Sequence, residues 1–212
     1  MPADAERFCL GVSGSDAAAR LGGDLSPREA LGYLVGAIRE AFEEVGVLLA
    51  CRPDGRFVSF TAENQERYAA YRAACQRDNA AFFDCLRAES LKLATDRLAY
   101  FSHWITPEES PIRFDTRFFA AVAPEGQEAV ADEEEVLDAR WLTPAEVFQA
   151  RERKEISLRF PTIKNLELLT GASRASDLVT RLGQREVPTI RPRVLVVDGH
   201  PQPVIPPDPR WY

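Results

Sequence analysis

Histidines and paired cysteines are scarce in this sequence of 212 residues. It contains two histidines, His103 and His200, and its four cysteines include no C-x-x-C pair. Because zinc sites are built mostly from closely spaced cysteines and histidines, the sequence argues against a zinc centre. The sequence does not start with a basic stretch followed by an apolar one, as a signal peptide would. Four cysteines in a chain of this length without a signal peptide are more typical of reduced thiols than of disulfides. We therefore expect a cytoplasmic protein.

Long apolar runs and an excess of basic residues are also missing. No stretch approaches the roughly 18 apolar residues of a membrane-spanning helix, so we expect no membrane segment. The formal net charge is -7, and an acidic surface repels the backbone of DNA or RNA, so we expect no nucleic-acid partner. A phosphate-bearing small molecule remains compatible with this charge, because a bound divalent cation inverts the local electrostatics.

The sequence is otherwise ordinary for a globular protein, with 45% hydrophobic and 28% charged residues. We expect one domain over 1–212. Ser26, Pro27 and Glu29 form a helix-start signal, and Gly46 can end that helix in the left-handed conformation. The predicted elements are this helix at 26–45, a helical insertion at 62–97, strands at 46–51, 99–105, 113–122 and 194–197, shorter helices at 16–21, 162–169 and 176–182, and a Pro-rich extension at 187–212.

The helix predicted at 26–45 has one apolar and one acidic face. At 100° per residue, a single stripe contains Leu31, Leu34, Val35, Ile38, Phe42 and Val45. Glu40, Glu43 and Glu44 lie on the opposite side, at spacings that make their carboxylates neighbours. Like charges so close cost a few tenths of a kcal/mol per pair, whereas clustered carboxylates are good ligands for Mg²⁺ or Mn²⁺. Spacing alone leaves a metal site and a solvated acidic face both open.

The segment 39–47 resembles the core of the Nudix box, whose pattern ends Arg-Glu-(apolar)-x-Glu-Glu-x-Gly-(apolar). Every fixed position of that half is present, from Arg39 to Gly46. The resemblance implies that Glu40, Glu43 and Glu44 hold divalent cations against a substrate diphosphate. It also implies that Arg39 orients one of these glutamates.

The upstream half of the box does not match. Gly23 and Glu29 have the family spacing, but nine residues separate Glu29 from Arg39, two more than in the family pattern. Two extra residues rotate a helical side chain by roughly 200°. Glu29 therefore points away from the other glutamates, and its place in the capping box accounts for it.

Three features are similar to a Nudix subfamily related to mammalian peroxisomal coenzyme A diphosphatases. They are the split box, the helical insertion after the box helix, and a strand pair at 100–107 and 113–119. Such proteins begin with two strands and a Phe-Pro-Gly-Gly loop, which are not found in this sequence. We therefore expect an N-terminally truncated domain with an unpaired sheet edge, and a homo-oligomer is among its expected states.

Candidate residues also occur outside the helix. Glu135 belongs to an acidic run of three glutamates at 133–135. The resemblance implies that a glutamate of this region reaches the metals or acts as a base, although such runs are commonly solvated loops. His103 lies in a predicted strand, where a packed histidine is the simpler interpretation. Arg113 and Arg117 flank Asp115 on one strand face and suit either phosphate recognition or ion pairing.

The resemblance implies an α+β fold, the Nudix α/β/α sandwich with a mixed sheet. It also implies a Mg²⁺- or Mn²⁺-dependent hydrolase that cleaves a diphosphate linkage in a nucleotide-like small molecule, with coenzyme A or acyl-coenzyme A favoured. The candidate catalytic residues are Arg39, Glu43 and Glu135, and the candidate metal ligands are Glu40, Glu43 and Glu44. The alternative is a truncated or degenerate Nudix domain without activity that binds a ligand or a protein. The missing strands favour this alternative, and the intact glutamate face opposes it.

Overall fold

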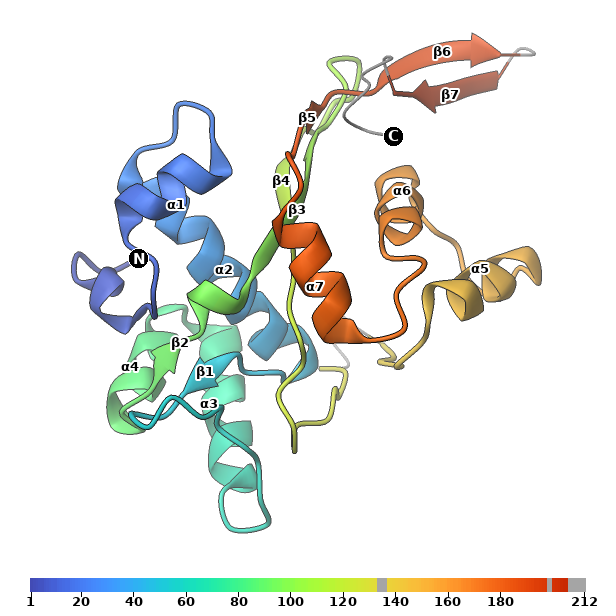
Figure 1. Cartoon of the computed structure of the whole chain (residues 1–212). Helices are drawn as coiled ribbons and strands as arrows, with labels where there is room; N and C mark the ends of the chain where they lie inside the picture. Colours follow the sequence, from blue (N-terminus) through green and yellow to red (C-terminus); the bar gives the residue numbers. More distant parts are fainter. Residues whose placement is uncertain (133–136, 198–199, 206–212) are drawn as a thin grey trace. The chain divides into compact units, whose positions relative to one another are not determined.

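The computed structural model describes residues 1–132, 137–197 and 200–205. The chain divides into two compact units, Met1–Leu98 with Val122–Arg140, and Ala99–Ala121 with Trp141–Tyr212. The first unit holds the box helix and the helical insertion, and the second holds a three-stranded sheet (Figure 1). Within the described ranges, no helix is both long enough and apolar enough to span a membrane.

The box lies on α2 (Pro27–Val45), which begins and ends where the sequence predicts. Its capping box is complete: the Ser26 hydroxyl accepts a hydrogen bond from the Glu29 N–H, and the Glu29 carboxylate accepts one from the Ser26 N–H. At the other end Gly46 has a φ of 71°, the left-handed conformation that glycine adopts most easily.

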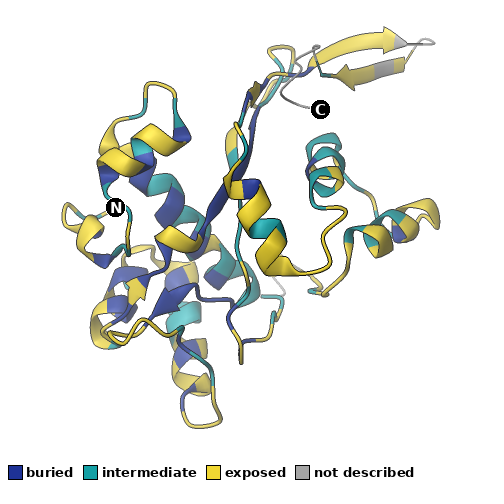
Figure 2. Cartoon of the chain, viewed as in Figure 1, coloured by how far each residue is buried: buried dark blue, intermediate teal, exposed yellow. Residues whose placement is uncertain are grey.

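One face of α2 packs into the core of the first unit. Ile38 and Phe42 are almost fully buried, as predicted, and α1 (Gly14–Leu21) packs against the same helix (Figure 2). Val45, predicted to be buried, is only half-buried, because it lies in the last turn, where the apolar stripe ends. Its carbonyl accepts a hydrogen bond from the Val130 N–H at 2.9 Å, so the segment before the acidic run lies beside the end of α2.

The strand predicted at 46–51 is largely wrong. Only β1 (Ala50–Cys51) is a strand, paired antiparallel with β2 (Lys92–Leu93). Residues 47–49 are buried, but a side chain binds the peptide of Leu48 in place of a neighbouring strand. Gln127 accepts from the Leu48 N–H at 2.8 Å and donates to the Leu48 carbonyl at 3.1 Å. Hydrophobic periodicity carries no sign of such a partner.

The helical insertion predicted at 62–97 contains two helices, α3 (Gln65–Arg77) and α4 (Ala80–Ala88), but its last part is not α-helical, because β2 lies within it. Phe82 of α4 is fully buried, and its ring centroid lies 6.5 Å from that of Phe42 on α2. Two short 3-10 helices, η1 (Ala5–Phe8) and η2 (Thr95–Arg97), complete this unit.

The second unit contains a mixed sheet in the order β4 (Asp115–Ala120), β3 (Ala99–Ile105), β5 (Thr189–Ile190). β3 pairs antiparallel with β4 and parallel with β5. β3 is buried almost throughout (Figure 2), and Leu182 of α7 (Ala175–Gly183) packs fully buried against Ala99 and Phe101. The predicted strand pair and the α+β class are confirmed.

The rest of the second unit consists of α5 (Pro144–Glu152), α6 (Phe160–Leu168) and the hairpin β6 (Arg193–Val197) and β7 (His200–Val204). β7 was not predicted. It contains Pro201 and Pro203, which lack an N–H and are typical of loops or edge strands. Because β7 pairs only with β6 among the described strands, the prolines need no second strand partner.

Candidate active site

The three box glutamates differ in their surroundings. The Glu40 side chain is 60% exposed, the Glu43 side chain is 13% exposed, and Glu44 is half-buried. All three lie on the side of α2 that faces away from Ile38 and Phe42. Within residues 1–132, 137–197 and 200–205, no three carboxylate, histidine or cysteine side chains are close enough together to hold a metal ion.

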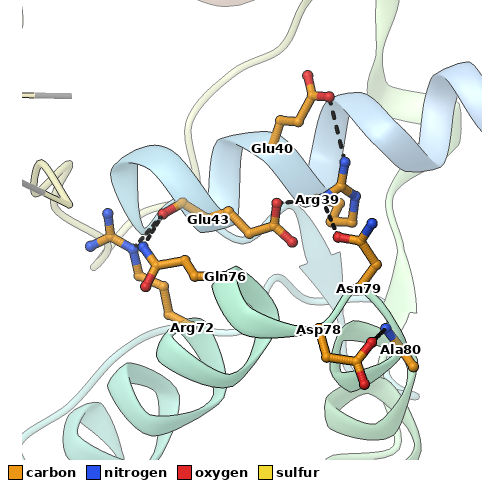
Figure 3. A network of polar contacts seen from close by, with 8 residues as sticks. All are labelled: Arg39, Glu40, Glu43, Arg72, Gln76, Asp78, Asn79 and Ala80. Carbon is orange, nitrogen blue, oxygen red and sulfur yellow. Dashed lines mark hydrogen bonds and ion pairs between the residues drawn. The ribbon is translucent and has the colours of Figure 1, made fainter. Parts of the chain in front are cut away.

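Arg39 is the centre of the polar contacts on this face (Figure 3). Its Nη1 donates a hydrogen bond to the Glu43 carboxylate and a second, of 2.9 Å, to Oδ1 of Asn79 at the start of α4. Its Nη2 lies 3.5 Å from Oε1 of Glu40. The structure thus brings Arg39, Glu40 and Glu43 together and adds Asn79, which the sequence did not indicate.

The end of the glutamate-bearing helix is held by α3. Arg72 donates from Nε to the Glu43 carbonyl at 2.9 Å and from Nη2 to the Glu44 carbonyl at 2.7 Å. Gln76 donates to the same Glu43 carbonyl at 2.9 Å (Figure 3). Partial burial lowers the pKa of Arg72, and the negative charge of Asp132 opposes this shift. Asp132, the last described residue before the acidic run, therefore lies near Arg72 and the end of α2.

One atom of the site lacks a hydrogen-bond partner among the described residues. Oε1 of Glu43 is buried and accepts no hydrogen bond there. Leaving a buried polar atom unpaired costs about 1–3 kcal/mol, and more for a charged one, so this position favours a cation or a donor. Carboxylate oxygens are the ligands that Mg²⁺ and Mn²⁺ prefer, so Glu43 fits a divalent cation.

The neighbouring thiol is not a candidate nucleophile. Burial raises the pKa of Cys75 to about 11, and the negative charge of Glu43 adds to the rise. Cys75 is therefore a neutral thiol at physiological pH, whereas nucleophilic and metal-binding cysteines are thiolates. The carboxylates are therefore the candidate reactive groups at the end of α2.

A cavity of about 490 Å³ adjoins Arg39 and Asn79. Gly32 and Gly36 of α2 are part of its lining, and a Cβ built at either glycine would meet no atom within 4 Å. Glycine inside a helix costs roughly 1 kcal/mol relative to alanine, so these two positions weaken α2 while leaving room above it.

The polar residues on the second unit form a separate cluster. His103 is buried; its Nε2 lies 2.6 Å from Oδ1 of Asp115 and its Nδ1 lies 3.0 Å from the Thr189 hydroxyl. The neutral Nε2–H tautomer satisfies both contacts, and burial lowers the pKa of His103 while the Asp115 hydrogen bond opposes this. Arg117 also pairs with Asp115, at 2.7 Å, and Arg113 donates to the Thr106 carbonyl at 3.2 Å. These contacts support ion pairing along the strands.

Glu135 lies outside the described residues, so its role stays a prediction. Arg72, Gln76 and Asn79 were not predicted from the sequence. They lie in a polar helical segment, where nothing in the sequence distinguishes an arginine or amide that contacts α2 from one that is only solvated. The last carbonyls of a helix such as α2 need hydrogen-bond donors from outside the helix, and this predicts that such donors exist. It does not predict which residues they are.

The fold described above is that of a Nudix hydrolase. The crystal structure of a Nudix hydrolase from Alicyclobacillus acidocaldarius matches with a TM-score of 0.62 and 24% identity, over 79% of this chain and 75% of that chain. A family model described as the NUDT19 Nudix domain matches residues 14–169, and the chain therefore belongs to this Nudix family.

Two curated relatives carry the name acyl-coenzyme A diphosphatase NUDT19. The protein from Xenopus laevis is 28% identical over 166 residues, which cover 74% of this chain and 43% of the relative. The protein from Homo sapiens is 29% identical over 157 residues, which cover 71% of this chain and 42% of the relative. The chain thus spans less than half the length of these relatives.

Proposed function

We propose that this chain is a hydrolase that cleaves the diphosphate linkage of acyl-coenzyme A with the help of Mg²⁺ or Mn²⁺. Membership of the Nudix family supports a diphosphate substrate, and the names of the two relatives support the coenzyme A class. The observation that carries the proposal is the Glu43 carboxylate, which Arg39 holds on one oxygen while the other is buried without a hydrogen bond from the described residues.

In this proposal Glu40, Glu43 and Glu44 hold the divalent cations. When bound, the cations neutralise the diphosphate and activate the attacking water. Arg39 acts through Glu43, whose side chain it holds in one direction, and is therefore a positioning residue. We propose Glu135 as a further ligand or a general base.

The test compares the purified chain with two glutamine variants on α2. Each protein is incubated with acyl-coenzyme A and Mg²⁺, and the two phosphate-bearing halves of the substrate are quantified by mass spectrometry. Glu43→Gln removes a charged ligand with little change in shape, so we expect turnover to fall on the order of 10²-fold or more. Glu29→Gln is the matched control, because Glu29 lies on the same helix and glutamine can keep the capping box.

Equal turnover in wild type and Glu43→Gln would contradict the assignment of this face. Faster cleavage of a nucleotide sugar or a dinucleotide than of acyl-coenzyme A would contradict the substrate class and leave the chemistry intact. A folded wild-type chain that binds no Mn²⁺ and turns over none of these substrates would support the alternative, a Nudix domain that only binds a ligand or a protein.

A further inference from the structure

We propose that the helical insertion positions the glutamate face of α2, through Arg72, Gln76 and Asn79, an inference that rests on the proposed function. The last carbonyls of a helix lack partners within the helix. Here side chains of α3 fill that need at two of the three candidate ligand residues: Arg72 binds the carbonyls of Glu43 and Glu44, and Gln76 binds that of Glu43. Fixing these peptides fixes where the two side chains start.

A second contact acts on the Glu43 side chain itself. Asn79 accepts a hydrogen bond from Nη1 of Arg39, and the same nitrogen donates to the Glu43 carboxylate. Glu43 is therefore held at its backbone by α3 and, through Arg39, at its carboxylate by the residue that precedes α4 (Figure 3). Partners that orient a metal ligand in this way commonly change metal affinity 10- to 100-fold when removed.

The glycine of the box fits the same arrangement. A Cβ built at Gly46 would lie 3.3 Å from Nη1 of Arg72, closer than most real Cβ contacts. Gly46 thus serves the left-handed turn and also leaves room for the guanidinium that binds the two preceding carbonyls.

Attachment of the insertion to α2 does not depend on these polar contacts alone. The buried rings of Phe42 and Phe82 meet at the α2–α4 contact. Within the insertion, Arg67 pairs with Glu89 at 2.7 Å, and Tyr68 and Tyr71 donate to the same carboxylate, which belongs to the insertion and not to α2. The insertion therefore offers polar contacts that reach the glutamate face and others that only join its own two helices.

The experiment measures the Mn²⁺ dissociation constant of the full chain by electron paramagnetic resonance, together with the melting temperature. The variants are Arg72→Ala, Arg72→Lys, Asn79→Ala and, as a matched control on α3, Arg67→Ala. We expect Arg72→Ala and Asn79→Ala to weaken Mn²⁺ binding about 10-fold or more. Arg72→Lys keeps the charge but loses the planar fork, so it should recover part of the affinity. Arg67→Ala should leave the affinity within roughly 2-fold of wild type, because the ion pair that it removes is with Glu89 and not with α2.

The outcomes separate this inference from the proposed function. Unchanged Mn²⁺ affinity in both Arg72→Ala and Asn79→Ala, beside a weakened Glu43→Gln, would overturn the positioning role alone. A wild-type chain without Mn²⁺ binding would overturn both. Because Asn79 is exposed, its variant should fold even if Arg72→Ala does not. If all four variants, including Arg67→Ala, weaken binding in proportion to lost thermal stability, the contacts are only structural and the inference is wrong.

Discussion

Replacing Gln127 should destabilise the segment that follows the end of α2. It is 8% exposed, and its amide bonds three peptide groups: the N–H and carbonyl of Leu48 and, at 2.7 Å, the carbonyl of Val58. It therefore ties the segment after the box to the segment that leads to the acidic run. Gln127→Met keeps an unbranched side chain of similar length and removes every polar atom.

The cost of Gln127→Met follows from the groups that it leaves unpaired. Besides the contact with Gln127, the Leu48 carbonyl accepts from the Ala50 N–H at 2.9 Å, so it keeps a partner. The Leu48 N–H and the Val58 carbonyl have no other hydrogen-bond partner in the described part of the chain, and both residues are fully buried. At about 1–3 kcal/mol per orphaned group, the free energy of unfolding should fall by about 2–6 kcal/mol.

Urea denaturation followed by circular dichroism measures this loss, and amide hydrogen exchange locates it. The Leu48 amide should exchange much faster in the variant, while β3 amides in the second unit should keep their protection. Gln65→Leu serves as a control, because Gln65 is exposed and makes no side-chain hydrogen bond to a described residue. A loss below about 1 kcal/mol with a protected Leu48 amide would refute the reasoning.

Three other predictions concern single positions. Gly46→Ala should lower the free energy of unfolding by about 1–2 kcal/mol because of its φ of 71°, whereas Gly36→Ala, in open space inside α2, should raise it by up to about 1 kcal/mol; equal effects in urea denaturation would contradict this. Burial lowers the pKa of His103 in the folded protein, so the stability that the neutral histidine contributes should be complete above about pH 6.5, the ordinary histidine pKa, and should be lost as the pH falls through the lower pKa of the folded state. His103→Gln should flatten this pH dependence of the free energy of unfolding, and the same pH dependence in wild type and variant would refute the prediction. Glu40→Gln should weaken Mn²⁺ binding without changing the melting temperature, and a melting shift above about 2 °C would show a structural role.

Local signals in the sequence predicted the parts of the fold that local interactions determine. The capping box at Ser26 and the glycine at 46 bounded α2 to the residue, since both act through contacts within one turn. Strands at 99–105 and 113–122, separated by a Pro-containing loop, were expected from the sequence, and their pairing from the family resemblance; β3 and β4 lie where expected. The mixed character of the sheet came from the family resemblance and is seen in the pairing of β3 with β5.

The parts that were missed depend on contacts between distant segments. Residues 47–49 have the composition of a strand, but the central residue, Leu48, is bound by the side chain of Gln127, which lies 79 positions away. Likewise Arg72 reaches Glu43 across 29 positions and Asn79 reaches Arg39 across 40. A spacing rule along one helix finds the carboxylates, because they share an axis, and cannot find donors from another helix.

The fixed positions of the box differ in how much each contributes to the stability of the fold. Gly46 is required by a left-handed turn, and Arg39 and Glu43 form a partly buried ion pair, so selection for a stable α2 would favour all three. Glu40 is different: its side chain is 60% exposed, and it makes a 3.5 Å ion pair with Arg39. Exposed pairs of this kind contribute about 0–1 kcal/mol, and Arg39 already has Glu43. A glutamate at position 40 therefore contributes little to the stability of the fold. Among the box positions, it is the one where a loss of metal binding would be easiest to distinguish from a loss of folding.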